Sequence, residues 1–145
     1  MARTSTYLNF ARSTEEAFNF YRTVFGSDFE GPIHRFSEIP AAPDQPAMPA
    51  EDRELVMHVA LPILGGHMLM GTDAPPSMGF TVTPGNNVYI NLEPDTRAEA
   101  DRLFEALAQN GKIESPMQEM FWGDYFGSLT DQFGVMWMVN TVSKT

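Results

Sequence analysis

Residues 13–26, STEEAFNFYRTVFG, decide the fold, because their pattern recurs once later in the chain. Ser13 and Glu16 have the spacing of a capping box, in which both side chains accept from backbone amides at the start of a helix. Gly26 is typical of the left-handed residue that ends a helix. The stretch therefore predicts an amphipathic helix. Its apolar stripe consists of Ala17, Phe20, Tyr21, Val24 and Phe25.

Residues 96–111, TRAEADRLFEALAQNG, repeat this arrangement. Thr96 and Glu99 again have capping-box spacing, and Gly111 after Asn110 ends the pattern. We interpret the two stretches as members of an internal repeat, because cap, box and stripe recur together. The second stripe consists of Ala100, Leu103, Phe104, Leu107 and Ala108.

Each predicted helix is preceded by one strand-like run and followed by three. In the first half, the strand-like runs are residues 6–11, then 29–38, 55–63 and 67–72. In the second half, they are residues 87–93, then 112–119, 125–131 and 135–142. Tight turns between the last two strands of each half are predicted at Gly65-Gly66 and at residues 131–134.

This order predicts an α+β fold in which two βαβββ modules form a curved mixed sheet. The modules cover about residues 4–72 and 87–142 of a single domain, residues 1–145, and the Pro- and Gly-containing residues 73–86 link them. One amphipathic helix covers only one face of a sheet. The other face must curl around the partner module, a ligand or another subunit, so we expect function there.

The amino-acid composition argues against some classes of binding partner. The chain has a net charge of −10, which disfavours binding to nucleic acid or to anionic membranes. It has no cysteine, so disulfides and thiolate chemistry are excluded. Residues 1–13 lack the apolar run of a signal peptide, and residues 55–66 are too short to span a membrane. We expect a cytoplasmic protein with neither nucleic-acid nor membrane partners.

Several motifs resemble those of the vicinal oxygen chelate superfamily. Phe20-Tyr21 with Phe25-Gly26 is similar to the F-Y-x-x-x-F-G signature of glyoxalase I, bleomycin-resistance proteins and extradiol dioxygenases. The PhnB-like branch is matched more closely, over nearly the whole chain. Its marks are residues 7–10, Met57-His58, and residues 69–73, 110–114, 118–123 and 130–140. The resemblance implies the paired-module fold and a homodimer.

Some members of this branch are described as similar to 3-demethylubiquinone-9 3-methyltransferases. Binding of S-adenosylmethionine on a nucleotide-binding fold requires a Gly-rich turn between strand and helix. Here the predicted helices follow Ala11-Arg12 and Pro94-Asp95 instead. The sequence therefore does not support methyl transfer.

Metal-dependent members of the superfamily hold one divalent ion with His and Glu from the first and last strands of each half. This chain offers Ser5 or Thr6 and residues 68–70, 87–91 and 136–138 at those places. Their hydroxyl, amide and thioether groups are poor ligands for Zn²⁺, Ni²⁺ or Fe²⁺. We predict no metal ion and no cofactor. His58 and His67, on neighbouring predicted strands, are an alternative ligand pair, although all three histidines, including His34, are also typical of hydrogen-bonded or surface residues.

Strand alternation predicts which side chains face away from the helices. Leu8 and Phe10 face the helix, and the core includes Val88, Ile90, Leu92, Val135, Trp137 and Val139. The predicted ligand-binding residues are Tyr7, Asn9, His58, Met70, Tyr89, Asn91, Gln118, Trp122 and Met138. Simple core packing of the methionines stays an alternative. So does a dimer contact or a local core for the aromatic side chains between residues 121 and 126.

Three functions are compatible with these patterns. The first is a metal-independent small-molecule-binding protein whose ligand the sequence does not name. The second is an enzyme of the lyase, isomerase or dioxygenase type, with Tyr7, His58 and Glu119 as acid–base candidates. The third is a structural dimer whose concave faces pack together. Residues 40–49, with proline at every third position, predict an extended spacer or lid.

Overall fold

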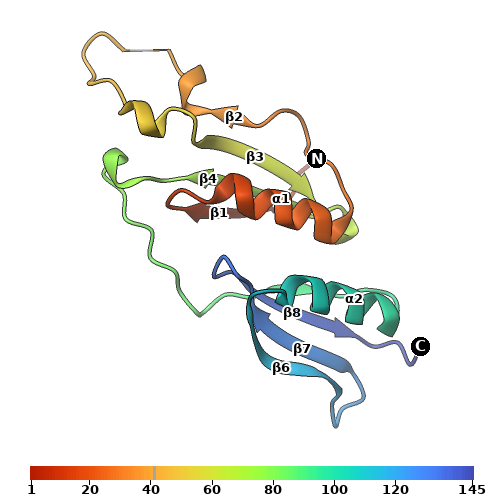
Figure 1. The fold of residues 1–145 in the computed structure, drawn as a ribbon. Coiled ribbons are helices and arrows are strands. Elements are labelled where there is room, and N and C mark those ends of the chain that lie inside the picture. Colours follow the sequence, from red (N-terminus) through yellow and green to blue (C-terminus); the bar gives the residue numbers. More distant parts are fainter. Residues whose placement is uncertain (41) are drawn as a thin grey trace. The chain divides into compact units, whose positions relative to one another are not determined.

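A computed structural model describes residues 1–40 and 42–145 of the chain. Ala41, within the proline-containing loop, lies outside the described residues. The chain divides into two compact units, Met1–Thr83 and Pro84–Thr145, and each contains one α-helix and one four-stranded sheet. The division falls between residues 73 and 86, where the sequence predicts the linker. In Figure 1 the first unit is coloured from red to green and the second from green to blue.

The elements of the two units follow the same order. In the first, they are β1 (Thr6–Phe10), α1 (Thr14–Phe25), β2 (His34–Arg35), β3 (Val56–Pro62) and β4 (Met68–Asp73). In the second, they are β5 (Ile90–Leu92), α2 (Arg97–Ala108), β6 (Lys112–Glu119), β7 (Tyr125–Thr130) and β8 (Met136–Thr141). Short 3₁₀ helices span Phe36–Glu38, Ala50–Asp52, Leu64–Gly66 and Pro76–Met78.

The two sheets have the same topology. Their strand orders are β1-β4-β3-β2 and β5-β8-β7-β6. The first strand of each unit pairs in parallel with the last, and the other pairings are antiparallel. The α+β class and the βαβββ repeat predicted from the two helical stretches are therefore confirmed.

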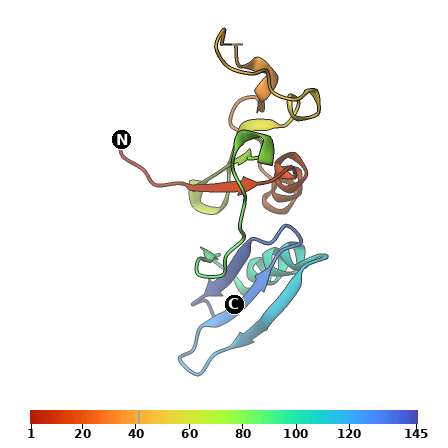
Figure 2. The ribbon, with the colours of Figure 1, turned by 90° about the vertical axis from the view of Figure 1, so that its left-hand side faces the viewer.

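Helix α1 covers one face of its sheet, as the view along the helix in Figure 2 shows. Its buried face consists of Thr14, Ala17, Phe18, Tyr21 and Val24. The expected stripe was wrong in placing Phe20 on this face instead of Phe18. At about 100° per residue, Phe20 lies about 100° around the helix from Tyr21 and is only half-buried. Phe25, at the end of the helix, is also half-buried.

Gly71 makes room for this packing on β4. A Cβ at this position would lie 2.5 Å from the Phe18 ring. The equivalent close approach in the second unit is at Gly127 on β7, where a Cβ would lie 2.8 Å from the Phe104 ring. In both units a glycine on a strand lets a helix phenylalanine approach the sheet closely.

The capping boxes form only in part. At α2, the Thr96 hydroxyl accepts a hydrogen bond from the Glu99 amide, as expected. The Glu99 carboxylate, however, accepts from Arg102. At α1, the expected box was wrong, because the Ser13 side chain makes no capping hydrogen bond. The carboxylate of Asp73, at the end of β4, accepts from the Thr14 amide instead.

The helix ends also differ from each other. Gly26 is left-handed (φ 61°) and donates to the Arg22 carbonyl oxygen, as expected. After α2 the left-handed residue is Asn110 (φ 58°). Gly111 is needed for another reason, since a Cβ there would lie 2.5 Å from the Thr130 carbonyl oxygen.

Two predicted strands are much shorter in the structure. Residues 29–38 form only the two-residue strand β2, which is followed directly by a 3₁₀ helix. Strand β5 begins at Ile90, so Val88 lies before it and is exposed rather than in the core. The core of the second unit lies between α2 and its sheet. It contains Leu92, Leu103, Phe104, Leu107, Leu129, Trp137 and Val139.

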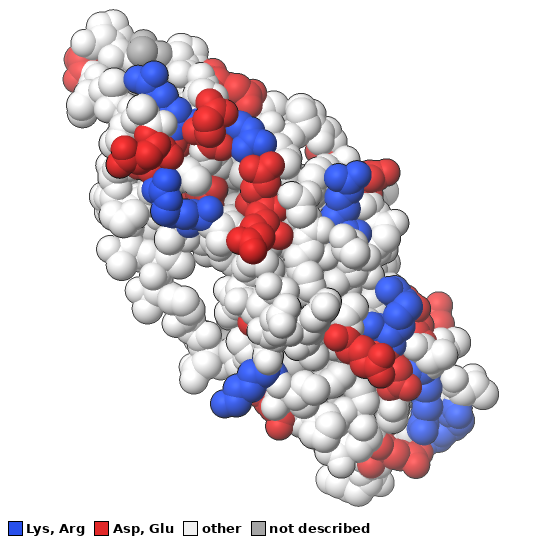
Figure 3. Space-filling view, in the orientation of Figure 1, with Lys and Arg blue, Asp and Glu red and all other residues white. Residues whose placement is uncertain are grey.

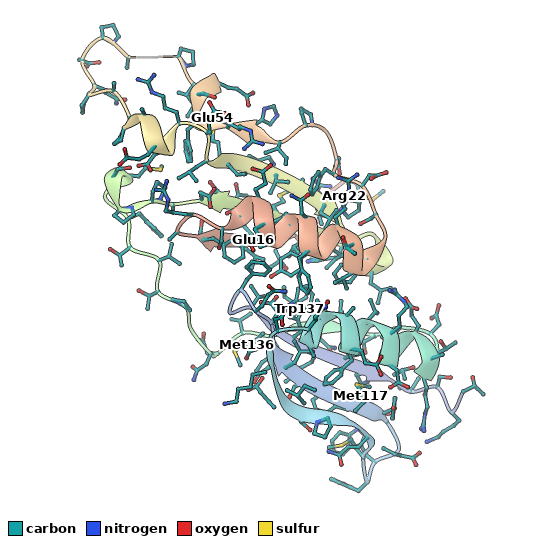
Figure 4. The ribbon with its side chains drawn as sticks, viewed as in Figure 1. Glu16, Arg22, Glu54, Met117, Met136 and Trp137 are labelled. Carbon is teal, nitrogen blue, oxygen red and sulfur yellow. The ribbon has the colours of Figure 1, made fainter. Side chains whose placement is uncertain are left out.

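Both predicted tight turns are present. Gly65 and Gly66 are left-handed (φ 69° and 78°) and join β3 to β4. Between β7 and β8, the buried Asp131 carboxylate accepts from the amides of Phe133 and Val135 and from Nε1 of Trp137. Figure 4 labels Trp137 at the start of β8.

The surface charges are mixed. On the face drawn in Figure 3, basic side chains lie beside acidic ones. Examples of ion pairs are Arg35 with Glu15, Arg97 with Glu119, and Arg102 with Glu99. Among the described residues, no helix has the length and apolar character that crossing a membrane requires.

Candidate functional site

In the first unit, the sheet face opposite α1 carries four of the predicted ligand-binding residues. Tyr7 pairs with Met70 across β1 and β4, and Asn9 lies two residues further along β1. His58 lies two residues before Ala60, which is the partner of Met70 on β3. Because side chains alternate along strands, all four point away from the face that contacts α1.

A hydrogen bond joins two of these residues across the sheet. The hydroxyl oxygen of Tyr7 lies 3.0 Å from Nδ1 of His58, and the ring centroids are 5.8 Å apart. The Tyr7 hydroxyl donates when Nδ1 is unprotonated, and Nδ1–H donates in the other tautomer. Partial desolvation of the Tyr7 side chain, which is 47% exposed, raises the pKa of its phenol above the ordinary value.

His34 lies beside this pair. It is opposite His58 in the pairing of β2 with β3. Its Nδ1 lies 3.0 Å from Oε1 of Glu38, whose Oε2 accepts from the Arg35 amide. The His34 and Arg35 hydrogen bonds lower the pKa of Glu38, so this carboxylate is ionised at neutral pH. The sequence reasoning missed His34 as a neighbour of His58, since the register of so short a strand has no sequence signal.

The alternative ligand pair, His58 with His67, is not brought together. His67 lies at the β3–β4 turn, where its carbonyl oxygen accepts from the Ile63 amide and its Nε2 lies 2.9 Å from the Thr6 hydroxyl. Ile63 is five residues from His58, which corresponds to roughly 16 Å along a strand. Within residues 1–40 and 42–145, no three His, Asp or Glu side chains are grouped so that they could hold a metal ion.

In the second unit, three of the five predicted residues lie on paired strands. Asn91 is opposite Met138 in the pairing of β5 with β8, and Gln118 is opposite Phe126 in that of β6 with β7. These side chains alternate with the buried Trp137 and Val139 on β8 and with Leu129 on β7, which contact the α2 side. They therefore share the face away from α2.

Tyr89 and Trp122 lie outside the strands. Tyr89 precedes β5 and its hydroxyl donates to the Glu114 carboxylate at 3.2 Å. Trp122 lies in the β6–β7 turn, half-exposed, with its ring perpendicular to that of Phe121 at 4.9 Å between centroids. Phe121 is almost fully exposed, so these two rings do not form a buried local core.

The acid–base candidate Glu119 is held in ion pairs. Its Oε1 lies 3.0 Å from Nη2 of Arg97 and 3.3 Å from Nζ of Lys144. These contacts, first the one with Arg97, lower the pKa of Glu119. The Arg97 side chain also donates to the Ser143 carbonyl oxygen, so Glu119 helps to fix the C-terminal residues.

Two hollows lie elsewhere. One, of about 770 Å³, lies between the loop that includes Phe36, Met48 and Arg53 and the 3₁₀ helix at Ser77 and Met78. The other, of about 630 Å³, lies beside α2 and is lined in part by Phe104, Ile113 and Met117, the last labelled in Figure 4. Neither is lined by a predicted ligand-binding residue.

Comparison with known proteins agrees with this architecture. Residues 2–140 match the family model described as 3-demethylubiquinone-9 3-methyltransferase. Protein YjdN from Escherichia coli is 34% identical over 97% of this chain and 95% of its own length. The crystal structure of protein PA1353 from Pseudomonas aeruginosa is 34% identical, with a TM-score of 0.81 over 97% of this chain and 98% of that one.

Two further structures extend the comparison. The PhnB protein from Bacillus cereus is 30% identical, with a TM-score of 0.73 over 97% of this chain and 99% of its own. A glyoxalase/bleomycin resistance protein/dioxygenase family enzyme from Burkholderia phytofirmans is 19% identical, with a TM-score of 0.62 over 95% of this chain and 98% of that one, and shares the fold. The chain therefore belongs to the family described as 3-demethylubiquinone-9 3-methyltransferase, which its likeness to the PhnB protein supports, and it shares the fold of glyoxalase/bleomycin resistance/dioxygenase proteins.

Proposed function

We propose that the chain binds a small organic molecule on the sheet faces that its helices leave uncovered, and that no metal ion mediates this binding. The observation that carries the proposal is the Tyr7–His58 hydrogen bond on the face opposite α1. Asn9 and Met70 lie on the same face. Ligand sites typically combine such fixed polar groups with adaptable apolar ones.

The donor groups support binding without a metal. Ser5, Thr6, Met138 and the neighbouring side chains at the superfamily's ligand positions are hydroxyl, amide, thioether or apolar groups. In the described part of the chain, no three His, Asp or Glu side chains are grouped so that they could hold a metal ion. Polar contacts from Tyr7 and His58 would then orient the ligand in place of an ion.

The proposal does not extend to methyl transfer, although the family description names that activity. The β1–α1 connection is Ala11-Arg12-Ser13, and the stretch before α2 contains Pro94-Asp95. Neither contains the glycines with which a nucleotide-binding fold approaches its cofactor closely.

Ligand binding is testable by thermal shift in buffer with EDTA, using short-chain quinones, catechols and 1,2-dicarbonyl compounds as probes. We expect at least one class to stabilise the protein, and Tyr7→Phe and His58→Gln to reduce its affinity about tenfold, as for a lost hydrogen bond of about 1.4 kcal/mol. His67→Gln is the matched control, because His67 lies at the other end of β3. Stabilisation that requires an added divalent ion would contradict the proposal.

Acid–base catalysis is the second candidate function. The specific observation in its favour is that the Tyr7 phenol is hydrogen-bonded to an imidazole. Such a pair can give a proton to a substrate oxygen and take one up. Turnover of the same probes, followed by product formation, should be lost in Tyr7→Phe. Binding without turnover would leave the first proposal standing alone.

We also propose that the two units act as one domain within a cytoplasmic homodimer. The support is the edge position of β2 and β6, whose outer backbone groups sheets commonly pair or cover. Sedimentation of the untagged protein at micromolar concentration should give twice the chain mass of 16.2 kDa. A monomer under these conditions would exclude the dimer.

A further inference from the structure

The hollow of about 770 Å³ in the first unit lies between the β2–β3 loop and the 3₁₀ helix Pro76–Met78, which follows β4 (Figure 1). Hydrogen bonds fix its frame. The Ser37 amide donates to the Arg53 carbonyl oxygen at 2.8 Å and so joins the two ends of the loop. The Ser77 hydroxyl donates to the Asp52 carboxylate and so holds the 3₁₀ helix to the loop. The hollow is therefore built into the first unit, and its volume lies within the range of about 300–1,000 Å³ that is typical of ligand sites.

The walls of this hollow are mostly apolar and open to solvent. Ile39 and Met78 are 52% and 49% exposed. Proline fixes one backbone angle at each of its positions, so a loop with several prolines is stiff and does not readily fold inward to fill the space. The other apolar residues of the wall are Phe36, Pro40, Ala42, Pro46, Ala47, Met48 and Pro49. A ligand with an apolar body would remove this surface from water, which favours binding.

Among the described residues that line the hollow, Arg53 alone is charged. Its Nε donates to the Met48 carbonyl oxygen at 3.3 Å, and its two terminal nitrogens have no partner among the described residues. The neighbouring Asp52 carboxylate is engaged by Arg12 and Ser77. Three further acidic residues of this region are outside the lining: Asp44, Glu51 and Glu54. The hollow thus combines apolar walls with one unpaired positive charge.

We propose that this hollow binds a small organic anion with an apolar body, of the aromatic carboxylate or sulfonate class, and that Arg53 holds its acidic group. A guanidinium group presents N–H donors in a planar fork that matches the oxygen atoms of such a group, and these charged hydrogen bonds are stronger than neutral ones. Tyr7, Asn9, His58 and Met70 do not line the hollow. The site is therefore separate from the proposed function and does not depend on it.

The test is a fluorescence titration of the untagged protein with anilinonaphthalene sulfonate, an aromatic anion whose emission rises in apolar surroundings. N-phenylnaphthylamine, which has the same rings without the sulfonate, is the uncharged probe. Arg53→Gln should weaken binding of the sulfonate at least about tenfold, as for a lost charged hydrogen bond, and change binding of the amine less than about twofold. Arg3→Gln removes a charge outside the lining and is the matched control, which should bind both probes like the unsubstituted chain. Equal losses for both probes in Arg53→Gln, or no binding of the sulfonate by the unsubstituted chain, would overturn the proposal.

A second measurement locates the probe without any substitution. In protein labelled with ¹³C at the methionine methyl groups, the sulfonate should shift the NMR signals of Met48 and Met78, which line the hollow. The signals of Met70 and Met138, on the sheet faces of the proposed function, should stay unchanged. Shifts of Met70 or Met138 without shifts of Met48 and Met78 would overturn this site and would still agree with the proposed function.

Discussion

At the scale of single residues, Thr14 shows a polar group without a partner. It is fully buried at the start of α1, and its hydroxyl has no hydrogen-bond partner among the described residues. A buried unpaired hydroxyl costs on the order of 1–3 kcal/mol. Thr14→Val keeps the shape, so we expect it to raise the free energy of unfolding by about 1 kcal/mol in urea denaturation.

Thr23→Val is the matched control on the same helix. The Thr23 hydroxyl is exposed and donates to the Asn19 carbonyl oxygen. The same substitution there should leave the unfolding free energy within about 0.5 kcal/mol of its original value. A loss of stability in Thr14→Val larger than in this control would mean that the hydroxyl has a partner, such as a buried water.

Where a strand is regular, the alternation of side chains along it correctly predicted the face of the sheet on which each side chain lies. Tyr7 and Asn9 lie on the expected face, because a side-chain period of two leaves only one choice once Leu8 and Phe10 are assigned to the helix side. The cap of α1 could not be found in this way. Asp73 replaces Ser13 there from a position far along the chain, and only the pairing of β1 with β4 brings it close.

At the scale of elements, the β7–β8 turn depends on one carboxylate. Asp131 is buried and accepts from two turn amides and from the indole nitrogen of Trp137, which is itself fully buried. Asp131→Ala leaves these donors unpaired, so we expect a loss of about 3 kcal/mol in unfolding free energy. Asp44→Ala, in an exposed loop, should change it by less than about 0.5 kcal/mol. Similar losses in both variants would contradict this role.

Strand boundaries were predictable where the local sequence has no competing conformation. Residues 112–119 form β6 with the expected limits. Residues 29–38 instead contain the left-handed Gly31, and the Glu38 side chain binds the Arg35 amide. That hydrogen bond favours the 3₁₀ turn that ends β2 after two residues. The apolar pattern alone gives no sign of this competition.

At the scale of the whole molecule, the internal repeat in the sequence was enough to predict the paired βαβββ fold. Two helices with the same cap and stripe spacing indicated two equal modules, and the two sheets have the same strand order. The sequence could not show that Asp52 joins three segments of the first unit. It accepts from Arg12 after β1 at 2.5 Å and from the hydroxyl of Ser77 after β4.

These contacts predict how stability depends on pH. The hydrogen bonds from Ser77 and Arg12 lower the pKa of Asp52 in the folded chain. A carboxyl group whose folded pKa is lowered stabilises the fold above its unfolded pKa of about 3.9, and this stabilisation is lost as the pH falls through the folded pKa. Asp52→Asn should therefore have a lower urea midpoint at pH 7, with a difference that shrinks as the pH falls below the unfolded pKa of about 3.9 and through the folded pKa. Asp44→Asn should match the unsubstituted chain throughout. If the difference in urea midpoint between Asp52→Asn and the unsubstituted chain stayed constant from pH 7 to pH 2, the prediction would be wrong. The loss of stability would then come from disturbed packing around the amide, and the ionised carboxylate would not hold the three segments together.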